Sequence, residues 1–286
     1  MRLSSGCREC MRRREHERTD DPAYLAAVDE ILENEGAVFP APYLAWLFSE
    51  KFRVMVREPE DYTLEKKQYN DLVLSMRKEL RKEIEQADDP FRRSLEYSRI
   101  GNYIDFSALP DVEEKTFLSL FGKSALRPEE LPVYEQFRRE CREAKTFLLV
   151  ADNCGEIVLD MLFLEQLKKL NPNIAAAVMV RGGMTVNDVT EEDAAYVGLT
   201  DIARVLAGPH AAPGLIVEHL ESEAKEAFWN AEVVLSKGQG NYEGISGCLR
   251  PVYFMFLCKC DMFAERFGVR KLTGILRKET GGVRDL

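Results

Sequence analysis

Two short polar segments carry residue types that can bind a divalent metal ion. Asp152 and Asn153 follow one apolar run of the chain, and Asn187 and Asp188 follow another. Carboxylate and amide oxygens are the ligands that hard divalent cations prefer in proteins. Asp and Asn are also favoured at helix N-termini, so a helix cap is the alternative for each pair. Two such pairs are less easily explained by caps than one, which favours a metal site.

A third polar segment, residues 236–243, contains a lysine and two glycines. Lys237 supplies a point charge for a phosphate group, and Gly238 and Gly240 let the backbone approach a ligand closely. The spacing is not that of a P-loop, and a tight turn with a solvated lysine is the alternative. Together the three segments predict metal-assisted hydrolysis of a phosphate ester, in which the metal polarises the phosphate and activates water while the lysine neutralises developing charge.

The second half of the chain contains the elements that must position these segments. Short apolar runs typical of buried strands alternate there with helical patterns. This alternation predicts an α/β fold with a doubly wound, mainly parallel sheet, in which ligands bind beyond the carboxyl ends of the strands. The expected strands are 146–150, 174–180, 202–206 and 232–235, and the expected helices are 156–170, 190–196 and 214–230.

The first half of the chain reads as helical, because its apolar residues recur at three- and four-residue spacing. Segment 61–86 is interpreted as a long surface helix, with an interaction helix as the alternative. We expect a helical N-terminal domain with its connector over 1–140, and an α/β domain over 141–286. Segment 110–132 is the expected connector. The expected helices are 24–34, 43–52, 62–85 and 92–103, and the apolar stripe of segment 61–86 is Leu72, Val73, Met76, Leu80 and Ile84.

Composition excludes several classes of protein. With 286 residues, 45% hydrophobic and 31% charged, the chain can bury a sizeable core. Its 49 acidic residues against 39 basic ones argue against nucleic acid as a partner. The longest late apolar run, 252–258, is far shorter than the roughly 18 residues of a membrane span, so no membrane partner is expected. Segment 1–14 lacks the apolar core of a secretory signal, which favours a cytoplasmic protein.

The chain resembles the DUF89 family of metal-dependent damage-control phosphatases, and within it the stand-alone prokaryotic subfamily. The resemblance extends over nearly the whole chain, and its motifs occur in the family's order. These motifs are Cys7-x-x-Cys10, Gly101-Asn102-x-x-Asp105, Asp152-Asn153-x-Gly155-Glu156, Arg181-Gly182 to Asn187-Asp188, and Lys237-Gly238-x-Gly240-Asn241-Tyr242-Glu243.

The resemblance implies a helical N-terminal domain on a Rossmann-like α/β domain, with the site between them. It implies hydrolysis of small phosphorylated metabolites, including sugar phosphates and phosphopantetheine-type compounds, with manganese, cobalt, nickel or magnesium as cofactor. The implied metal ligands are Asp152, Asn153 and Asp188, and the implied substrate ligands are Lys237, Gly238, Gly240, Asn241, Glu243, Asn102 and Asp105, the last two reaching in from the helical domain.

Two glutamates are further candidates for catalysis. Glu156 and Glu243 are each interpreted as a general base or as a supporting residue, and Glu156 is alternatively a first-turn carboxylate favoured by the helix dipole. Aspartyl-phosphate phosphatases usually have an Asp-x-Asp pair after the first strand. Here Asn153 follows Asp152, which favours water over a carboxylate as the nucleophile without deciding the question.

The seven cysteines are interpreted as thiols unless a metal binds some of them. Cys7 and Cys10 have the C-x-x-C spacing of a zinc or redox pair, but two ligands do not complete a tetrahedral site. Cys260, which resembles a cysteine of the subfamily, is a third candidate, as are Cys258 and His16. A second, structural metal or redox site is therefore one hypothesis, and buried or idle thiols are the other.

Two other functions remain open at this stage. A methyltransferase acting on protein carboxylates has been proposed within the wider family, but segment 151–156 has one glycine where a methyl-donor site normally has a glycine-rich turn. A protein that binds a metal or phosphometabolite without turnover is the second alternative. The sequence leaves the oligomeric state and the physiological substrate undetermined.

Overall fold

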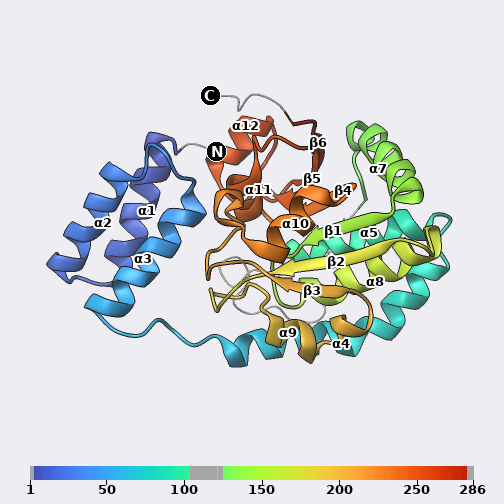
Figure 1. Ribbon diagram of the computed structural model, residues 1–286, viewed down its shortest axis with the longest axis horizontal. Helices are drawn as coiled ribbons and strands as arrows, with labels where there is room; N and C mark the ends of the chain where they lie inside the picture. The colour runs from blue at the N-terminus through green and yellow to red at the C-terminus, as the bar shows by residue number, and fades with distance from the viewer. Residues whose placement is uncertain (1–2, 104–120, 122–124, 282–286) are drawn as a thin grey trace.

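The computed structural model describes residues 3–103, 121 and 125–281, and its centre is a six-stranded sheet (Figure 1). The strands are β1 (Thr146–Val150), β2 (Ala175–Val180), β3 (Arg204–Ala207), β4 (Val233–Lys237), β5 (Val252–Leu257) and β6 (Gly274–Glu279). Their order is β3-β2-β1-β4-β5-β6, with β1 to β5 parallel and β6 antiparallel to β5. This order is that of Rossmann-like folds, so the predicted fold class, a helical N-terminal region with a mainly parallel doubly wound sheet, is confirmed.

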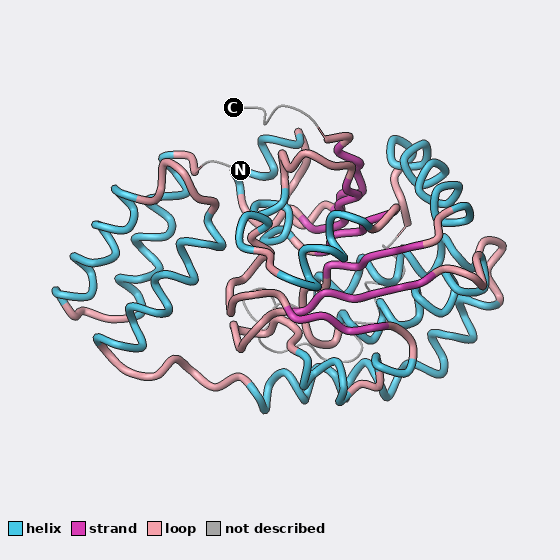
Figure 2. The backbone as a smooth tube through the Cα atoms, in the orientation of Figure 1, coloured by secondary structure: helices cyan, strands magenta, loops and turns pink. Residues whose placement is uncertain are grey.

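Helices cover both faces of the sheet because successive side chains of a strand point to opposite sides. Phe147 and Leu149 of β1 belong to one apolar core, and Leu148 and Val150 belong to a second. Figure 2 shows the strands between these two layers of helices. The first core includes α4 (Thr63–Glu85), α5 (Pro90–Ile100), α7 (Leu131–Glu143), α8 (Glu156–Leu170) and α9 (Glu191–Tyr196), and the second includes α10 (Ser222–Asn230), α11 (Gln239–Ile245) and α12 (Asp261–Phe267).

The helix predicted over 61–86 is α4, and one face of it is buried. Val73, Met76, Leu80 and Ile84 are buried, and Leu72 packs partly buried against the same core. α4 packs against α8, while most of its Glu and Lys side chains lie on the exposed outer face; Lys66 is buried instead and pairs with Asp193 at 2.5 Å. Across the ranges that the structure describes, we find no helix with both the length and the apolar character to cross a bilayer.

The first three helices form a group of their own, drawn in blue in Figure 1. They are α1 (Ser5–Arg18), α2 (Pro22–Asn34) and α3 (Ala41–Met55), with a separate apolar core that includes Tyr24, Leu44 and Phe48. Segment 56–62 links them to α4, and α3 packs against α11. The boundary predicted after residue 140 falls within α7, whose Phe137 shares a core with β1. The division into two domains therefore stays a prediction.

The helix predicted over 214–230 is wrong in its first half. The α-helix begins only at Ser222, and residues 214–221 contain a single 3-10 turn, Val217–His219. The backbone of this stretch is used for tertiary contacts instead: the Leu215 N–H donates to Asn241 Oδ1 at 2.8 Å, and a side chain at Gly214 would contact the carbonyl of Gly240. Of the expected connector 110–132, the structure describes mainly the 3-10 turn Pro128–Glu130 and the start of α7.

Candidate metal and phosphate site

The segments that follow β1 and β2 are hydrogen-bonded to each other. The Val189 N–H donates to the carbonyl oxygen of Asp152 at 2.9 Å, and the Cys154 N–H donates to that of Asn187 at 2.8 Å. These bonds bring Asp152 and Asp188 together at the carboxyl edge of the parallel strands, which is the edge predicted for a ligand.

Arg181, the first residue after β2, contacts both aspartates. Its Nε donates to Asp188 Oδ2 at 2.5 Å, its Nη2 to Asp152 Oδ1 at 3.2 Å, and its Nη1 to Asn241 Oδ1 at 2.8 Å. The side chain is buried. Because a guanidinium presents its N–H groups in a fixed plane, Arg181 sets the two carboxylates in a defined relation to each other.

Two asparagine amides hold the other side of the site. Nδ2 of Asn102 donates to Asp152 Oδ2 at 2.8 Å and to Glu156 Oε2 at 3.2 Å, and its Oδ1 accepts from the Leu257 N–H at 3.1 Å. Nδ2 of Asn153 donates to the same two carboxylates at 2.8 and 2.9 Å. Asn102, which follows α5, therefore reaches into the site from the helical part of the chain.

Lys237 ends β4 with its ammonium enclosed in the protein. Its Nζ lies 2.6 Å from Glu156 Oε1, 2.6 Å from Asp160 Oδ1 and 3.1 Å from the carbonyl oxygen of Ser98. All three charged side chains are 0% exposed. Burial is the largest single effect and lowers the pKa of Lys237, but the charges of Asp160 and Glu156 and their hydrogen bonds to the ammonium together outweigh it, and the pKa is raised. The structure thus gives Lys237 an interior ion-pair network, and its predicted contact with phosphate stays a prediction.

Negative charge is in excess at this edge of the sheet. Burial raises the pKa of Asp152 to about 7, and the negative charges of Asp188 and Glu156 act in the same direction. The positive charges of Lys259 and Arg181 lower it. A buried carboxyl in this environment is stabilised as an anion when a cation binds to it.

The donor set of the site fits a divalent cation. Four buried carboxylates stand against the two buried cations Arg181 and Lys237, so a divalent ion would offset the excess of negative charge. In the described ranges, no cluster of three or more His, Cys, Asp or Glu side chains has the geometry of a metal site, so an ion here would need the amide oxygen of Asn153 as a further ligand. The four carboxylates are Asp152, Glu156, Asp160 and Asp188.

Gly238 is required where it lies. Its φ is +80°, a region that side chains rarely adopt, and a Cβ there would overlap the carboxylate of Asp152. The glycine therefore allows the end of β4 and Asp152, which follows β1, to approach each other.

We expect Gly238→Ala to lower kcat/KM about 100-fold, because displacing a reacting group by about 1 Å can cost that much. Positive φ also costs about 1–2 kcal/mol of stability. Gly268→Ala is the matched control, since Gly268 has φ +62° and open space around its Cβ position. Steady-state kinetics and denaturant unfolding should show a stability loss in both variants and an activity loss in Gly238→Ala alone; equal activity in the two variants would contradict this role.

Two other residues of segment 237–243 tie the surrounding loops together. Nδ2 of Asn241 donates to the carbonyl oxygens of Ala151 and Lys237 at 2.9 and 2.7 Å. A side chain at Gly240 would overlap the carbonyl of Pro213. Both residues lie at the site, and their predicted contact with substrate stays a prediction.

Other predicted residues are not brought to this site by the structure. Asp105 lies outside the described residues. Cys7 and Cys10 lie on α1, Cys260 precedes α12, and all three are free thiols. They belong to no cluster of three metal-ligating side chains within the described chain, and a second metal or redox site stays a prediction.

Lys259 is a site residue that sequence reasoning missed. It follows β5, it is partly exposed, and its charge lowers the pKa of Asp152. Its backbone N–H donates to Oε1 of Gln239 at 3.0 Å, whose Nε2 donates to Oε1 of Glu243 at 3.0 Å. The signal was present: run 252–258 is apolar and is followed directly by Lys259, which is the pattern of one more buried strand that ends at the same edge of the sheet.

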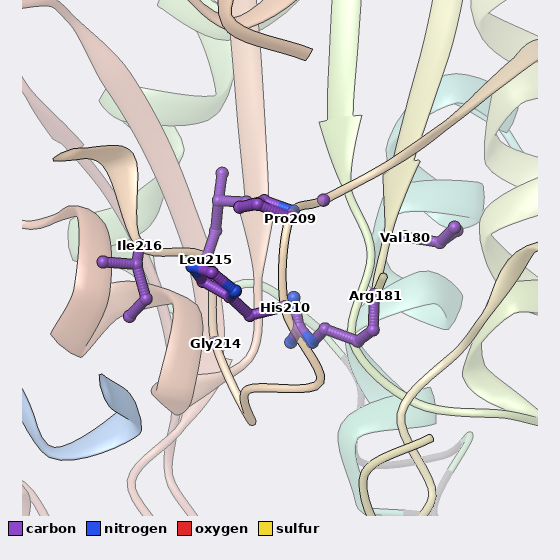
Figure 3. Close-up of a pocket in the computed structure, with 8 residues that line it drawn as sticks. Val180, Arg181, Pro209, His210, Gly214, Leu215 and Ile216 are labelled. Carbon is purple, nitrogen blue, oxygen red and sulfur yellow. The ribbon is translucent and has the colours of Figure 1, made fainter. Parts of the chain in front are cut away.

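A narrow pocket lies beside Arg181, between the end of β2 and the loop after β3 (Figure 3). In that loop His210 Nε2 lies 2.9 Å from His219 Nδ1, and Trp46 of α3 stacks on the His210 ring at a centroid distance of 4.1 Å. Helix α3 therefore packs against the rim of the site. The pocket is lined by Val180, Arg181, Gly208, Pro209, His210, Gly214, Leu215 and Ile216.

Comparison with known proteins shows the family to which this fold belongs. The model of the damage-control phosphatase ARMT1-like domain matches residues 3–273. A protein of Archaeoglobus fulgidus named damage-control phosphatase is 28% identical over 284 residues, covering 94% of this chain and 96% of that protein. A damage-control phosphatase of Pyrococcus horikoshii is 29% identical over 185 residues, covering 63% of this chain and 62% of its own. The crystal structure of a DUF89 family protein from Pyrococcus horikoshii superposes with a TM-score of 0.79 at 22% identity, covering 97% of this chain and 99% of that one.

Proposed function

Since the chain belongs to the damage-control phosphatase ARMT1-like family, we propose that it is a metal-dependent phosphatase that hydrolyses small phosphorylated metabolites. Two relatives named damage-control phosphatases support the reaction class. The observation that carries the metal dependence is the buried pair Asp152 and Asp188, joined through Arg181. Manganese, cobalt, nickel or magnesium would suit the oxygen ligands.

In this proposal Asp152, Asn153 and Asp188 hold the cation. A bound divalent ion would polarise the phosphate and activate water. Arg181 and Asn102 keep Asp152 in place by hydrogen bonds to its two carboxylate oxygens. Glu156 orients Asn153 in the same way, because its carboxylate accepts a hydrogen bond from Asn153 and pairs with Lys237.

Lys259 is the proposed contact for the phosphate group. Lys237 is 0% exposed and ion-paired. Lys259 is partly exposed, and its positive charge lowers the pKa of Asp152. A cation at the mouth of a site dominated by carboxylates offsets the repulsion that a phosphate anion would meet there.

Replacing Lys259 with glutamine should lower kcat/KM about 10- to 100-fold, because a hydrogen bond to a charged group contributes about 1.5–3 kcal/mol. Lys271→Gln is the control, since Lys271 forms an exposed pair with Asp261 at 2.9 Å and should leave kcat/KM within about twofold. Steady-state kinetics at several salt concentrations give the comparison. Equal values for both variants would remove Lys259 from the site.

The proposed substrates are sugar phosphates and phosphopantetheine-type compounds. A panel of these esters and of nucleotides, incubated with chelator or with one divalent metal at a time, should release phosphate only when metal is present. Metal and ester binding without release would favour a binding protein instead. Binding of a methyl donor in calorimetry, in the absence of phosphate release, would favour methyl transfer.

A further inference from the structure

The segment that carries Lys259 is fixed at three successive peptide groups. The Leu257 N–H donates to Asn102 Oδ1 at 3.1 Å, and the Cys258 N–H donates to the carbonyl oxygen of Thr273 at 3.1 Å. The Lys259 N–H itself donates to the side chain of Gln239 at 3.0 Å. Gln239 is thus the side chain that holds the peptide group of Lys259 itself.

Gln239 is in turn oriented by a second side chain of α11. Its Nε2 donates to Oε1 of Glu243 at 3.0 Å and to Sγ of Cys260 at 3.8 Å. Glu243 lies one helical turn further on. Burial raises its pKa, while the hydrogen bond from Gln239 and the positive charge of Arg14 on α1 oppose this rise. Helix α3 packs against α11, which fixes the helix that carries Gln239 and Glu243.

The amide of Gln239 can satisfy these partners in one orientation only. Its oxygen faces an N–H group and its nitrogen faces a carboxylate. If the amide were flipped, two donors would meet at Lys259 and two acceptors would meet at Glu243. Glu243 therefore keeps the acceptor of Gln239 directed at Lys259.

We propose that Gln239 and Glu243 are positioning residues that place Lys259 to receive the phosphate group of the substrate. The inference rests on the proposed function and deepens it, because it assigns phosphate affinity to a pair of residues that do not touch the phosphate. Gln239 follows the segment Lys237-Gly238, so the pair also links the end of β4 to the end of β5.

An exchange of the two side chains tests the pair. Gln239→Glu keeps an acceptor for Lys259 but puts two carboxylates against each other, and it should weaken inorganic phosphate binding to the Mn²⁺-loaded protein about tenfold. KM should rise by a similar factor, with kcat changed less than about threefold. Adding Glu243→Gln lets the new amide at position 243 donate to the new carboxylate at position 239. In this double variant the phosphate affinity and KM should return to within about twofold of the unchanged protein.

The control is Gln136→Glu, because Gln136 and Glu140 form the same kind of pair on α7, with Nε2 to Oε1 at 2.9 Å, and Glu140 pairs with Lys278 of β6 instead of a residue of the site. It should leave phosphate affinity unchanged. Unchanged affinity in Gln239→Glu, or a double variant that folds without regaining affinity, would overturn the inference. Phosphate binding without ester hydrolysis would refute the proposed function while leaving this comparison valid, and absence of phosphate binding in the unchanged protein would refute both.

Discussion

Asp152→Asn is expected to lower the rate of phosphate-ester hydrolysis at least about 10³-fold while the protein stays folded. Asp152 contacts Arg181 through one carboxylate oxygen and Asn102 and Asn153 through the other. Losing a metal-binding carboxylate removes several kcal/mol of transition-state stabilisation, and each tenfold in rate corresponds to about 1.4 kcal/mol. Steady-state kinetics at saturating metal measure this loss.

The stability of Asp152→Asn should change far less than its activity. Burial raises the pKa of Asp152 to about 7, with Asp188 and Glu156 adding to the effect. Without metal, removing this buried charge should offset the cost of an amide N–H that faces the donors of Arg181 or of Asn102 and Asn153, so the free energy of unfolding should change by less than about 1 kcal/mol, the size of one net hydrogen bond. Asp201→Asn, at an exposed position, is the control and should retain full activity. Retained turnover in Asp152→Asn would refute the assignment of the site.

Lys237→Met is expected to destabilise the protein by about 3–5 kcal/mol, because it leaves buried carboxylates without their cation. Glu156 and Asp160 each lie 2.6 Å from the Lys237 ammonium, and neither is exposed. Burial already raises the pKa of Asp160 to about 6, and the charge of Lys237 opposes this rise. A loss of this size is a large part of the total stability of a typical domain, about 5–15 kcal/mol. Urea unfolding at pH 7.5 measures it.

Lys271→Met provides the comparison for this stability change. Lys271 and Asp261 form an ion pair of similar length, 2.9 Å, but their side chains are 51% and 81% exposed. Exposed pairs contribute about 0–1 kcal/mol, so this variant should unfold close to the unchanged protein. If Lys237→Met unfolded at the same urea concentration as Lys271→Met, the interior network would not have the structural role described above.

The sheet was largely predictable because its strands are short apolar runs followed by polar loops. β1 (Thr146–Val150) has the predicted bounds. Asp152 and Asp188 lie at the same edge of the sheet, as predicted, because the carboxyl ends of parallel strands meet there. Two strands of the sheet, β5 and the antiparallel β6, were not predicted, nor were the helices α1, α7, α11 and α12. Residues 214–221 were predicted as helix because their apolar spacing suits one, but tertiary contacts of Gly214 and Leu215 override local propensity there.

Burial was the property that the sequence could not supply for the lysines of the site. Lys237 and Lys259 both follow strands, and only the packing of α5 and α8 over β4 shows that Lys237 is enclosed by Ser98, Glu156 and Asp160. Asn102 and Asp152 are 50 residues apart in the sequence, so a local sequence pattern does not reveal that they are in contact. The resemblance to a family was the signal that identified Asn102.

Titration of the metal-free protein with Mn²⁺ tests the central claim most directly, with bound ion measured by electron paramagnetic resonance and phosphate release measured in the same samples. The account predicts one bound ion per chain through Asp152, Asn153 and Asp188, with turnover rising at the same Mn²⁺ concentration as binding, and with both lost in Asp152→Asn. Full turnover in chelator, or tight Mn²⁺ binding that persists in Asp152→Asn, would contradict it.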